Sequence, residues 1–518
     1  MLAAFMRCAE AAPDELAMAV PGTPDPTKHT FGQLRERAER FAGGLRRSGL
    51  RPGDRVILAS PPSADFYALA LALAGSGMTV VLIDGSMDRR RLMSALRSAR
   101  ARAVVSVGAA LRRWPLLPPL LRMRRYAVDR PSWGVRSLEE LAGEPAALAD
   151  PGDDDPLIIS FTSGSSGRAK GVVRTHGELR AQHEALGRHF PLAPGDVDMP
   201  AFPAMVLHNL CSGVATVIPP VDLRRPGAAD PVALVEAVRR HGVTTLSGAP
   251  AYLGRLADHL EATGDRLPGV RRILAGGAPV PRRLCSRLVE LFPETETTVV
   301  YGATEAEPIA HVAMREVVAT DGDGHLVGPP VPEVEAQLVE LPERLERELR
   351  PGELSAQAVP LGEVLVTGDG VSRQYVGDPA SNAARKVQEA GGRVWHRTGD
   401  VARIDADGRL WLLGRTGDLV RHRDRALHPL ALEAAVSELP GVRAAGLVAH
   451  PGAPDGELAV VADGPSALTG VRSHLRDSGL DELPVRLVES IPTDARHNSK
   501  VDRAALARQL SDRRLPRT

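Results

Sequence analysis

Hydrophobic positions in the first three hundred residues switch repeatedly between helical and strand spacing. The pattern predicts a helix over residues 31–48, a strand over 55–59, a helix over 64–75 and a strand over 79–83. Similar segments follow at residues 157–161, 233–241, 243–247, 271–275 and 297–300. Alternation of this kind is typical of a layered α/β body, which we expect to extend to about residue 413.

Beyond Gly414 the predicted elements become shorter. A basic link over residues 415–425 precedes a helix at 428–437, strands at 444–449 and 457–462, and a last helix at 465–478. About a hundred residues are enough for a small domain. We therefore predict a large multi-layer α/β domain over residues 1–414 and a small α+β domain over residues 415–518.

Composition limits the classes of partner. The 518 residues are 43% hydrophobic and 25% charged, which is typical of globular proteins, and 64 Lys plus Arg balance 64 Asp plus Glu. This balance gives no general attraction for nucleic acid, so we expect no nucleic-acid partner. No apolar stretch reaches the roughly 20 residues that cross a bilayer, so we expect no stable membrane insertion. Three widely spaced cysteines and no signal peptide favour the cytoplasm.

One segment departs from this composition. Residues 111–125, LRRWPLLPPLLRMRR, are apolar, rich in proline and contain five arginines. Two interpretations are open: a solvated surface segment, or a docking patch for a partner enzyme or a membrane surface.

A loop of glycines and hydroxyls follows the strand at 157–161 and ends in a lysine. It reads Thr162-Ser163-Gly164-Ser165-Ser166-Gly167-Arg168-Ala169-Lys170-Gly171. Glycines let backbone N–H groups converge on an anion, hydroxyls add donors, and lysine supplies a point charge. The loop is not a Walker motif, because glycine and valine, and no hydroxyl residue, follow Lys170. The pattern predicts a phosphate-binding loop.

This loop resembles the phosphate loop of the adenylate-forming superfamily, which contains acyl-CoA synthetases, peptide-synthetase adenylation domains and luciferases. The usual pattern is T-S-G-[ST]-T-G-x-P-K-G, and Ser166 and Ala169 replace its Thr and Pro. The resemblance implies that Thr162 and Lys170 act in catalysis and that Thr162 also lies at the metal. It further implies nucleotide binding by Ser163, Gly164, Ser165, Ser166 and Gly167.

Two further motifs follow in the order that the family has them. Gly277, Ala278 and Pro279 resemble the family's adenine-binding turn, in which small residues admit the purine. The segment 301–305 resembles Y-G-x-T-E. The resemblance implies that Tyr301 stacks on adenine, that Gly302 and Thr304 lie at the nucleotide with Thr304 facing the α-phosphate, and that Glu305 holds Mg²⁺.

The last motifs lie near the predicted domain boundary and the tail. Asp400, in T-G-D, is implied to bind the ribose hydroxyls, and Arg415, in G-R-x-x-D, the ribose or a phosphate. Gly417-Asp418 would be the hinge on which a mobile C-terminal domain turns. Lys500 would enter on that domain and bridge the substrate carboxylate and the α-phosphate.

The implied reaction uses ATP and Mg²⁺ to convert a small-molecule carboxylic acid into an acyl-AMP and pyrophosphate. Carboxylate and ATP are both anions, so the enzyme has to neutralise and align them, and no side-chain nucleophile is required.

The fate of the acyl-AMP depends on a different region. Coenzyme A ligases continue G-R-x-x-D with x-I-K-x-x-G-x-x-I-x-P-x-E-I-E, but here Asp424 replaces the glycine, Arg421 the lysine and Ala431 the first glutamate. A carboxylate there should obstruct and repel the phosphate-bearing thiol. The run 494–501 instead resembles D-x-R-H-N-x-K-I of β-lactone synthetases of olefin biosynthesis, as do residues 198–203 and 215–219. This implies adenylation of a 3-hydroxy acid, whose own hydroxyl then closes the lactone.

Other functions stay open from the sequence. A conventional acyl-CoA or aryl-CoA ligase and a diazotising relative that acts on an amino-aryl acid would share the same adenylation motifs. A catalytically silent nucleotide-binding protein is disfavoured, because Lys170, Glu305, Asp400 and Lys500 are all present. His208 and His497 are each either a general base or an ordinary hydrogen-bonding residue.

Overall fold

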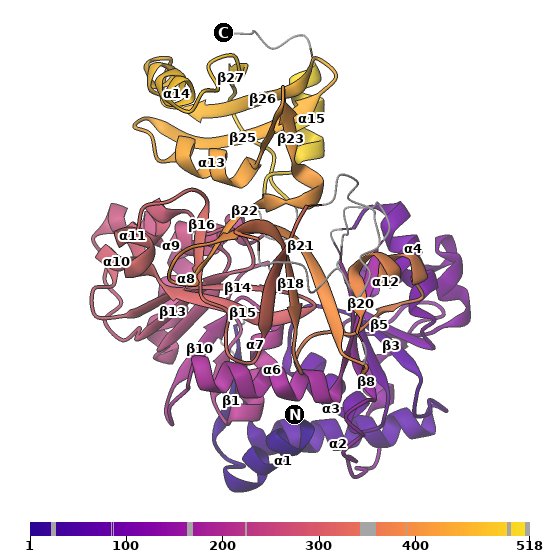
Figure 1. The fold of residues 1–518 in the computed structure, drawn as a ribbon. Coiled ribbons are helices and arrows are strands. Elements are labelled where there is room, and N and C mark those ends of the chain that lie inside the picture. The colour runs from indigo at the N-terminus through magenta and orange to yellow at the C-terminus, as the bar shows by residue number, and fades with distance from the viewer. Residues whose placement is uncertain are drawn as a thin grey trace.

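The computed structural model describes residues 1–21, 27–83, 85, 87–162, 169–222, 225–341, 359–389, 391–494 and 499–512. A large body built on three sheets carries a smaller α/β unit formed by the end of the chain (Figure 1). This is the predicted fold class. The boundary at residue 414 and the mobility of the smaller unit stay predictions.

Two eight-stranded, mostly parallel sheets form the lower part of the body. The first has the order β15 (Ala306–Ala313), β14 (Glu296–Ala303), β13 (Arg272–Gly276), β12 (Thr245–Gly248), β10 (Val197–Pro200), β11 (Ala215–Val217), β1 (Leu16–Val20) and β2 (Thr27–Thr30). The second has the order β19 (Tyr375–Val376), β9 (Lys170–Thr175), β8 (Pro156–Thr162), β4 (Thr79–Ile83), β3 (Arg55–Ala59), β5 (Ala103–Ser106), β6 (Arg124–Ala127) and β7 (Arg136–Ser137).

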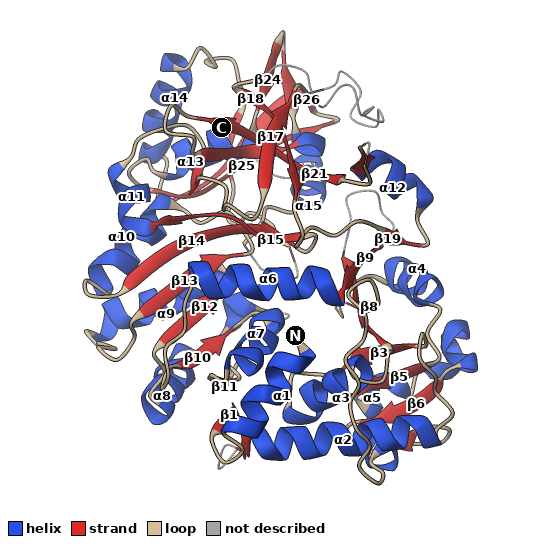
Figure 2. Ribbon diagram, turned by 60° about the horizontal axis from the view of Figure 1, so that its bottom comes forward, coloured by secondary structure: helices blue, strands red, loops and turns tan. Residues whose placement is uncertain are grey.

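Helices cover these sheets and fill the space between them (Figure 2). They are α1 (Leu2–Ala11), α2 (Phe31–Arg47), α3 (Ala64–Ala74), α4 (Arg89–Ala99), α5 (Gly108–Leu111), α6 (His176–His189), α7 (Pro203–Ser212), α8 (Pro231–His241), α9 (Pro250–Thr263), α10 (Arg282–Leu291), α11 (Met314–Ala319) and α12 (Pro379–Arg385). Thr30 caps the start of α2, because its hydroxyl accepts from the Gln33 N–H and the Gln33 side chain accepts from the Thr30 N–H. α3 is apolar on nearly all sides and accordingly lies almost wholly buried.

The alternation of helices and parallel strands stops before residue 413, although the large body itself continues. A third sheet of antiparallel strands occupies this part of the chain. Its order is β16 (His325–Gly328), β22 (Leu410–Arg415), β21 (Val394–Ile404), β18 (Leu361–Thr367) and β17 (Glu335–Val339), with β20 (Lys386–Gln388) beside β21. Antiparallel strands are joined without crossover helices, so this part of the chain lacks the helix–strand alternation on which the prediction was based.

The C-terminal unit contains more structure than the sequence indicated. The expected basic link forms the short helix η6 (Thr416–Asp418) and a hairpin of β23 (Val420–His422) and β24 (Arg425–Leu427). The remaining elements are α13 (Pro429–Ser437), β25 (Val442–His450), β26 (Ala453–Ala462), α14 (Ser466–Asp477), β27 (Val485–Leu487) and α15 (Arg503–Ser511). α14 is therefore not the last helix, since α15 packs on β25 after the predicted tail motif.

Residues 111–125 form a folded surface segment. Most of it consists of two short 3₁₀ helices, η1 (Trp114–Leu116) and η2 (Pro118–Arg122), which lead into β6. Leu111, Leu120 and Met123 are buried in a cluster with α4, whereas Leu116 and Leu121 are exposed. None of the described helices is both long and apolar enough to span a bilayer.

A polar cluster is enclosed in the large body around a strand of the first sheet. The Asp198 side chain of β10 is fully buried and accepts from the Asn209 amide at 2.8 Å. Burial raises the pKa of Asp198 to about 7, and the Asn209 hydrogen bond opposes that rise. Asp198 therefore keeps its proton in the folded protein at pH values where an unfolded chain has released it.

Replacing Asp198 with asparagine is expected to change how stability depends on pH. Between about pH 4 and pH 7 the folded wild type binds a proton that the unfolded chain loses, so stability falls as pH rises through this window. The asparagine side chain does not titrate, and we expect D198N to be more stable than the wild type by about 2 kcal/mol near pH 8 and by much less near pH 5. Thermal unfolding of both proteins across this range measures the difference, and parallel pH profiles would contradict the assignment.

Candidate active site

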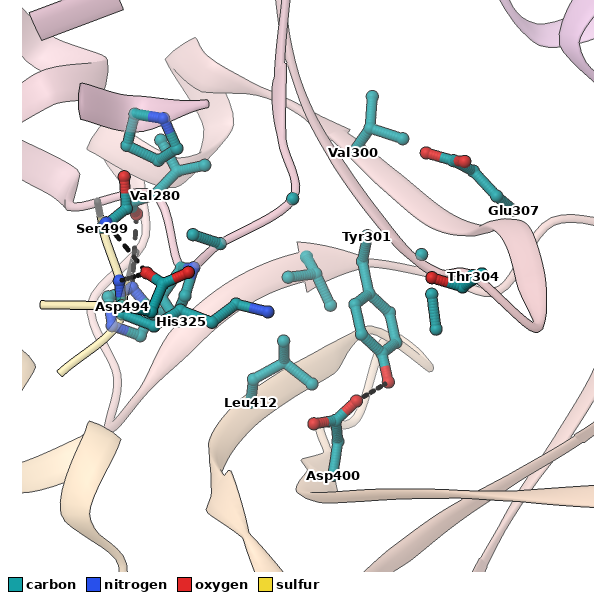
Figure 3. Close-up of a pocket in the computed structure, with 18 of the residues that line it drawn as sticks. Val280, Val300, Tyr301, Thr304, Glu307, His325, Asp400, Leu412, Asp494 and Ser499 are labelled. Atoms are coloured by element: carbon teal, nitrogen blue, oxygen red, sulfur yellow. Dashed lines mark hydrogen bonds between the residues drawn. The ribbon is translucent and has the colours of Figure 1, made fainter. Parts of the chain in front are cut away.

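One cavity of about 2040 Å³ lies between the large body and the C-terminal unit. Many of the predicted site residues line it together: Lys170, Gly277, Ala278, Pro279, Tyr301, Gly302, Thr304, Glu305, Asp400, Arg415 and Lys500. Figure 3 shows Tyr301 and Asp400 on one side, with Asp494 and Ser499 from the chain tail across from them. The structure thus gathers motifs that the sequence spreads over more than 300 residues.

The predicted phosphate loop connects two paired strands. β8 and β9 are antiparallel, and their register sets Thr162 opposite Lys170, so the chain returns on itself at the cavity. Burial, and then the guanidinium of Arg385, lower the pKa of Lys170. Ser163, Gly164, Ser165, Ser166 and Gly167 lie outside the described residues, as does the Thr162 side chain.

Tyr301, Asp400 and Arg415 form a hydrogen-bonded group at the predicted nucleoside position. The Tyr301 hydroxyl donates to Asp400 Oδ2 at 2.8 Å, and Arg415 Nη1 lies 3.2 Å from Asp400 Oδ1. The pairing of β21 with β22 sets Asp400 directly opposite Arg415. Gly399 has φ +78°, and a Cβ there would lie 2.7 Å from Arg385 Nη1. The positive φ is therefore the reason for the glycine of T-G-D, since the nearby arginine nitrogen is the end of a flexible side chain.

The predicted purine side of the cavity is formed by a turn and an aromatic ring. Gly277 has φ +77° and opens the turn that continues through Ala278 and Pro279. The Tyr301 ring is buried beside it, and burial followed by the Asp400 carboxylate raises the pKa of its phenol. Tyr301 therefore stays a neutral donor. A flat surface next to small side chains suits a purine, although adenine binding here stays a prediction.

Glu305 presents the carboxylate expected to hold the metal. It lies in the tight connection between β14 and β15, and its Oε1 accepts from the Tyr375 hydroxyl at 2.8 Å. No group of three or more His, Cys, Asp or Glu side chains gathers as a metal site in the described part of the chain. Mg²⁺ commonly uses one or two carboxylates together with substrate phosphates. One carboxylate facing the cavity fits that type of ion.

Sequence reasoning missed the residues that support Glu305. Arg174 is buried, lies 3.6 Å from Glu178, and donates to the Thr304 carbonyl at 3.0 Å. Lys386 is also buried, donates to the Ser372 carbonyl, and places its ammonium 5.1 Å from the centre of the Tyr375 ring. The sequence signal that could have identified Arg174 is its position as a charged residue at the end of the apolar strand G-V-V-R.

The chain tail reaches the cavity at Ser499 and Lys500, next to an antiparallel bridge between Thr493 and Val501. The backbone N–H groups of Ser499 and Lys500 donate to Asp494 Oδ1 at 3.2 and 2.9 Å. The Ser499 hydroxyl in turn accepts from the Ala251 N–H of α9 at 3.1 Å. These contacts fix the backbone beside Lys500 against the large body. The structure therefore brings the predicted catalytic lysine to the cavity in this arrangement of the two parts.

The two histidines considered as bases have different outcomes. His208 is buried, its Nδ1 lies 2.9 Å from Nδ1 of His183, and it is not among the lining residues. Burial, followed by the His183 charge, lowers the pKa of His208 to about 3. This neutral residue therefore has no direct access to the reacting groups. His497 lies outside the described residues.

Apolar residues near the N-terminus line one part of this cavity, which we call the apolar branch. It is lined by side chains of α1, α3 and α7, including Leu2, Phe66, Ala70, Leu71, Leu207 and Cys211. α1 packs against α7 (Figure 2), and the Cys211 thiol lies 3.3 Å from the Met1 carbonyl. The three cysteines of the chain are free thiols. This branch can bury an aliphatic chain but offers it few polar partners.

Comparison with known proteins gives a consistent picture. Residues 5–376 match the family model described as AMP-binding enzyme. The olefin beta-lactone synthetase of Stenotrophomonas maltophilia (strain K279a) is 34% identical over 92% of this chain and 90% of its own length. A feruloyl-CoA synthase of an Amycolatopsis species is 29% identical over 90% of this chain and 91% of its own.

Solved structures share the fold. The O-succinylbenzoate coenzyme A synthetase of Bacillus subtilis, determined in complex with ATP and a magnesium ion, superposes with a TM-score of 0.77. The match covers 97% of this chain and 98% of that protein at 20% identity. At this identity the similarity establishes the arrangement of elements, including a large N-terminal body and a smaller C-terminal unit.

Proposed function

Because the chain belongs to the AMP-binding enzyme family and is an adenylate-forming enzyme, we propose that it activates an aliphatic 3-hydroxy acid and closes it to a β-lactone without coenzyme A. The family uses ATP and acts on small-molecule carboxylic acids. The 3-hydroxyl, the lactone product and the roles of individual residues belong to the proposal.

In the first step, a carboxylate oxygen of the acid attacks the α-phosphorus of ATP, and pyrophosphate leaves with the electrons of the broken P–O bond. Lys170 and Lys500, which line one cavity, would offset the charge of the phosphates and the carboxylate. Asp400 and Tyr301 would hold the nucleoside so that the reacting atoms stay aligned. Mg²⁺ bound by Glu305 and the phosphates would spread further positive charge over the phosphate oxygens.

In the second step, the 3-hydroxyl oxygen attacks the acyl carbon, its proton goes to solvent or a base, and AMP leaves. The acid loses the elements of one water. Attack within one molecule needs no second substrate and gains from the proximity of its two groups.

The observation that carries the coenzyme A-independent part is Asp424. It lies at the exposed tip of the β23–β24 hairpin, next to Arg423, which has φ +54°. The family's coenzyme A ligases have glycine at this position, and a carboxylate would repel an incoming phosphate-bearing thiol. Similarity to an olefin beta-lactone synthetase over most of both chains also supports a reaction without coenzyme A.

Product analysis tests the proposal. The protein is incubated with ATP, Mg²⁺ and a 3-hydroxy fatty acid without coenzyme A, and we expect AMP, pyrophosphate and a product lighter than the acid by one water. The matched control is the same acid without its 3-hydroxyl. We expect the reaction of this acid to stop at acyl-AMP. ADP in place of AMP would exclude adenylation. AMP release that requires coenzyme A would instead favour an acyl-CoA ligase, the function of the similar feruloyl-CoA synthase.

The apolar branch predicts a dependence on chain length. Ala70 of α3 lines this branch and is 8% exposed. In A70F the ring would fill the path, so we expect KM for long-chain acids to rise at least about tenfold, with KM for ATP unchanged. A short-chain acid serves as the control substrate, and thermal unfolding detects any overpacking of the core. Equal losses on short and long acids would contradict this placement of the acyl chain.

A further inference from the structure

The chain concentrates positive charge in one part of its sequence. Residues 89–136 contain thirteen arginines and one acidic residue, Asp129, although the whole chain has equal numbers of basic and acidic side chains. We call the surface formed by this segment the cationic corner. The net positive charge of this segment stands out against the neutral balance of the whole chain. None of its arginines is among the residues predicted to carry the adenylation chemistry.

The fold brings this segment together at one edge of the second sheet. β5, β6 and β7 are the last three strands of that sheet, with β5 and β6 labelled in Figure 2, and η2 packs beside α4. The Arg125 side chain donates to the carbonyl of Leu120 at one end and to that of Gly134, in the β6–β7 connection, at 3.0 Å. The 3₁₀ helices and that connection therefore share one surface.

Large apolar side chains are exposed on the same surface. Trp133 is 83% exposed, Leu116 70% and Leu121 53%, and these are the three highest values for large hydrophobic residues in the described part of the chain. The exposed arginines around them include Arg112, Arg113, Arg122 and Arg124, and the described residues offer none of these four an ion pair. Apolar and cationic groups thus reach solvent together.

This combination identifies the kind of partner. Arginines pair with phosphate groups, leucines insert among acyl chains, and tryptophan favours the boundary between the two. An acidic protein or a nucleic acid would use the charge but would leave isolated leucines at the rim of the contact. We propose that the cationic corner binds the surface of an anionic phospholipid bilayer, with the body of the protein remaining outside the membrane.

Such a surface has a use in the proposed reaction. The apolar acid of the proposed function would be concentrated in a bilayer, and an enzyme docked there would meet its substrate at high local density. That benefit rests on the proposed function. The binding itself does not, and a test of binding needs no substrate.

Sedimentation with lipid vesicles tests the proposal on the full-length protein. We expect the wild type to bind vesicles containing phosphatidylglycerol, to bind phosphatidylcholine vesicles much more weakly, and to be released by high salt. Each arginine near an anionic surface contributes about a fivefold change in partitioning, so R113E/R122E should bind at least about 25-fold more weakly.

Two further variants make the result specific. R240E/R476E changes the net charge by the same amount at exposed positions of α8 and α14 and should bind as the wild type does. L116S/L121S keeps every charge and should also bind more weakly. Wild-type protein that ignores anionic vesicles, or equal losses in the two charge-reversal variants, would overturn the proposal. Unchanged binding of L116S/L121S would overturn it as well, because the surface would then be one for a soluble polyanion.

Discussion

K500A is expected to form acyl-AMP about 10²- to 10³-fold more slowly than the wild type and to bind ATP almost as tightly. The Lys500 side chain lines the cavity that also contains Lys170 and Asp400. Removing one preorganised positive group costs most where negative charge is being rearranged, which is in the transition state. Its backbone N–H donates to Asp494, and alanine retains that bond, so the tail should keep its conformation.

Pyrophosphate exchange measures the rate of this step, and nucleotide titration measures affinity. K28A is the matched control, since Lys28 is an exposed lysine in the N-terminal part of the chain that does not line the cavity. A fall in ATP affinity as large as the fall in rate would show that Lys500 holds the ground-state nucleotide, which contradicts the assigned role.

E305Q is expected to lower the adenylation rate about 10²-fold and to raise the Mg²⁺ concentration required for half-maximal activity. Glutamine keeps an oxygen that can accept from the Tyr375 hydroxyl, so the local structure should persist. It loses the negative charge that a hard cation prefers. A magnesium titration at saturating ATP measures the shift.

E307Q is the control for this substitution. Glu307 lines the same cavity two residues further along the chain, and we expect a much smaller effect there. If both variants lose activity equally, the effect would come from the overall charge of the cavity. If E305Q titrates with magnesium as the wild type does, Glu305 is not the ligand.

Individual elements show where the sequence was sufficient. The strands β3 and β4 and the helix α2 lie where the periodicity predicts them, within a residue of the expected ends. The predicted phosphate loop and the motifs Y-G-x-T-E and T-G-D were recognisable because each is a short run of residue types that one backbone geometry requires. Gly399 illustrates this, since its φ of +78° is a backbone conformation that side chains other than glycine rarely adopt.

The supporting contacts were not predictable in the same way. Tyr375 is 70 residues from Glu305, and Arg174 is 130 residues from the Thr304 carbonyl that it binds. Neither pair shares a motif. The third sheet was not predicted for a related reason, because no predicted element falls within residues 325–409 and its pairing joins distant segments such as β16 and β22.

The sequence by itself determined the family of the chain and predicted which residues carry the adenylation chemistry, since glycine, hydroxyl, lysine and carboxylate at fixed spacing are set by local backbone requirements. The tertiary structure decided which of them meet, how Glu305 and Asp400 are held, and that the 3₁₀ helices η1 and η2 share one surface with the β6–β7 connection. Hydrophobic periodicity specifies the face that each element buries. It does not specify the neighbour against which that face packs, and the order of the strands settles this only when the whole chain is folded.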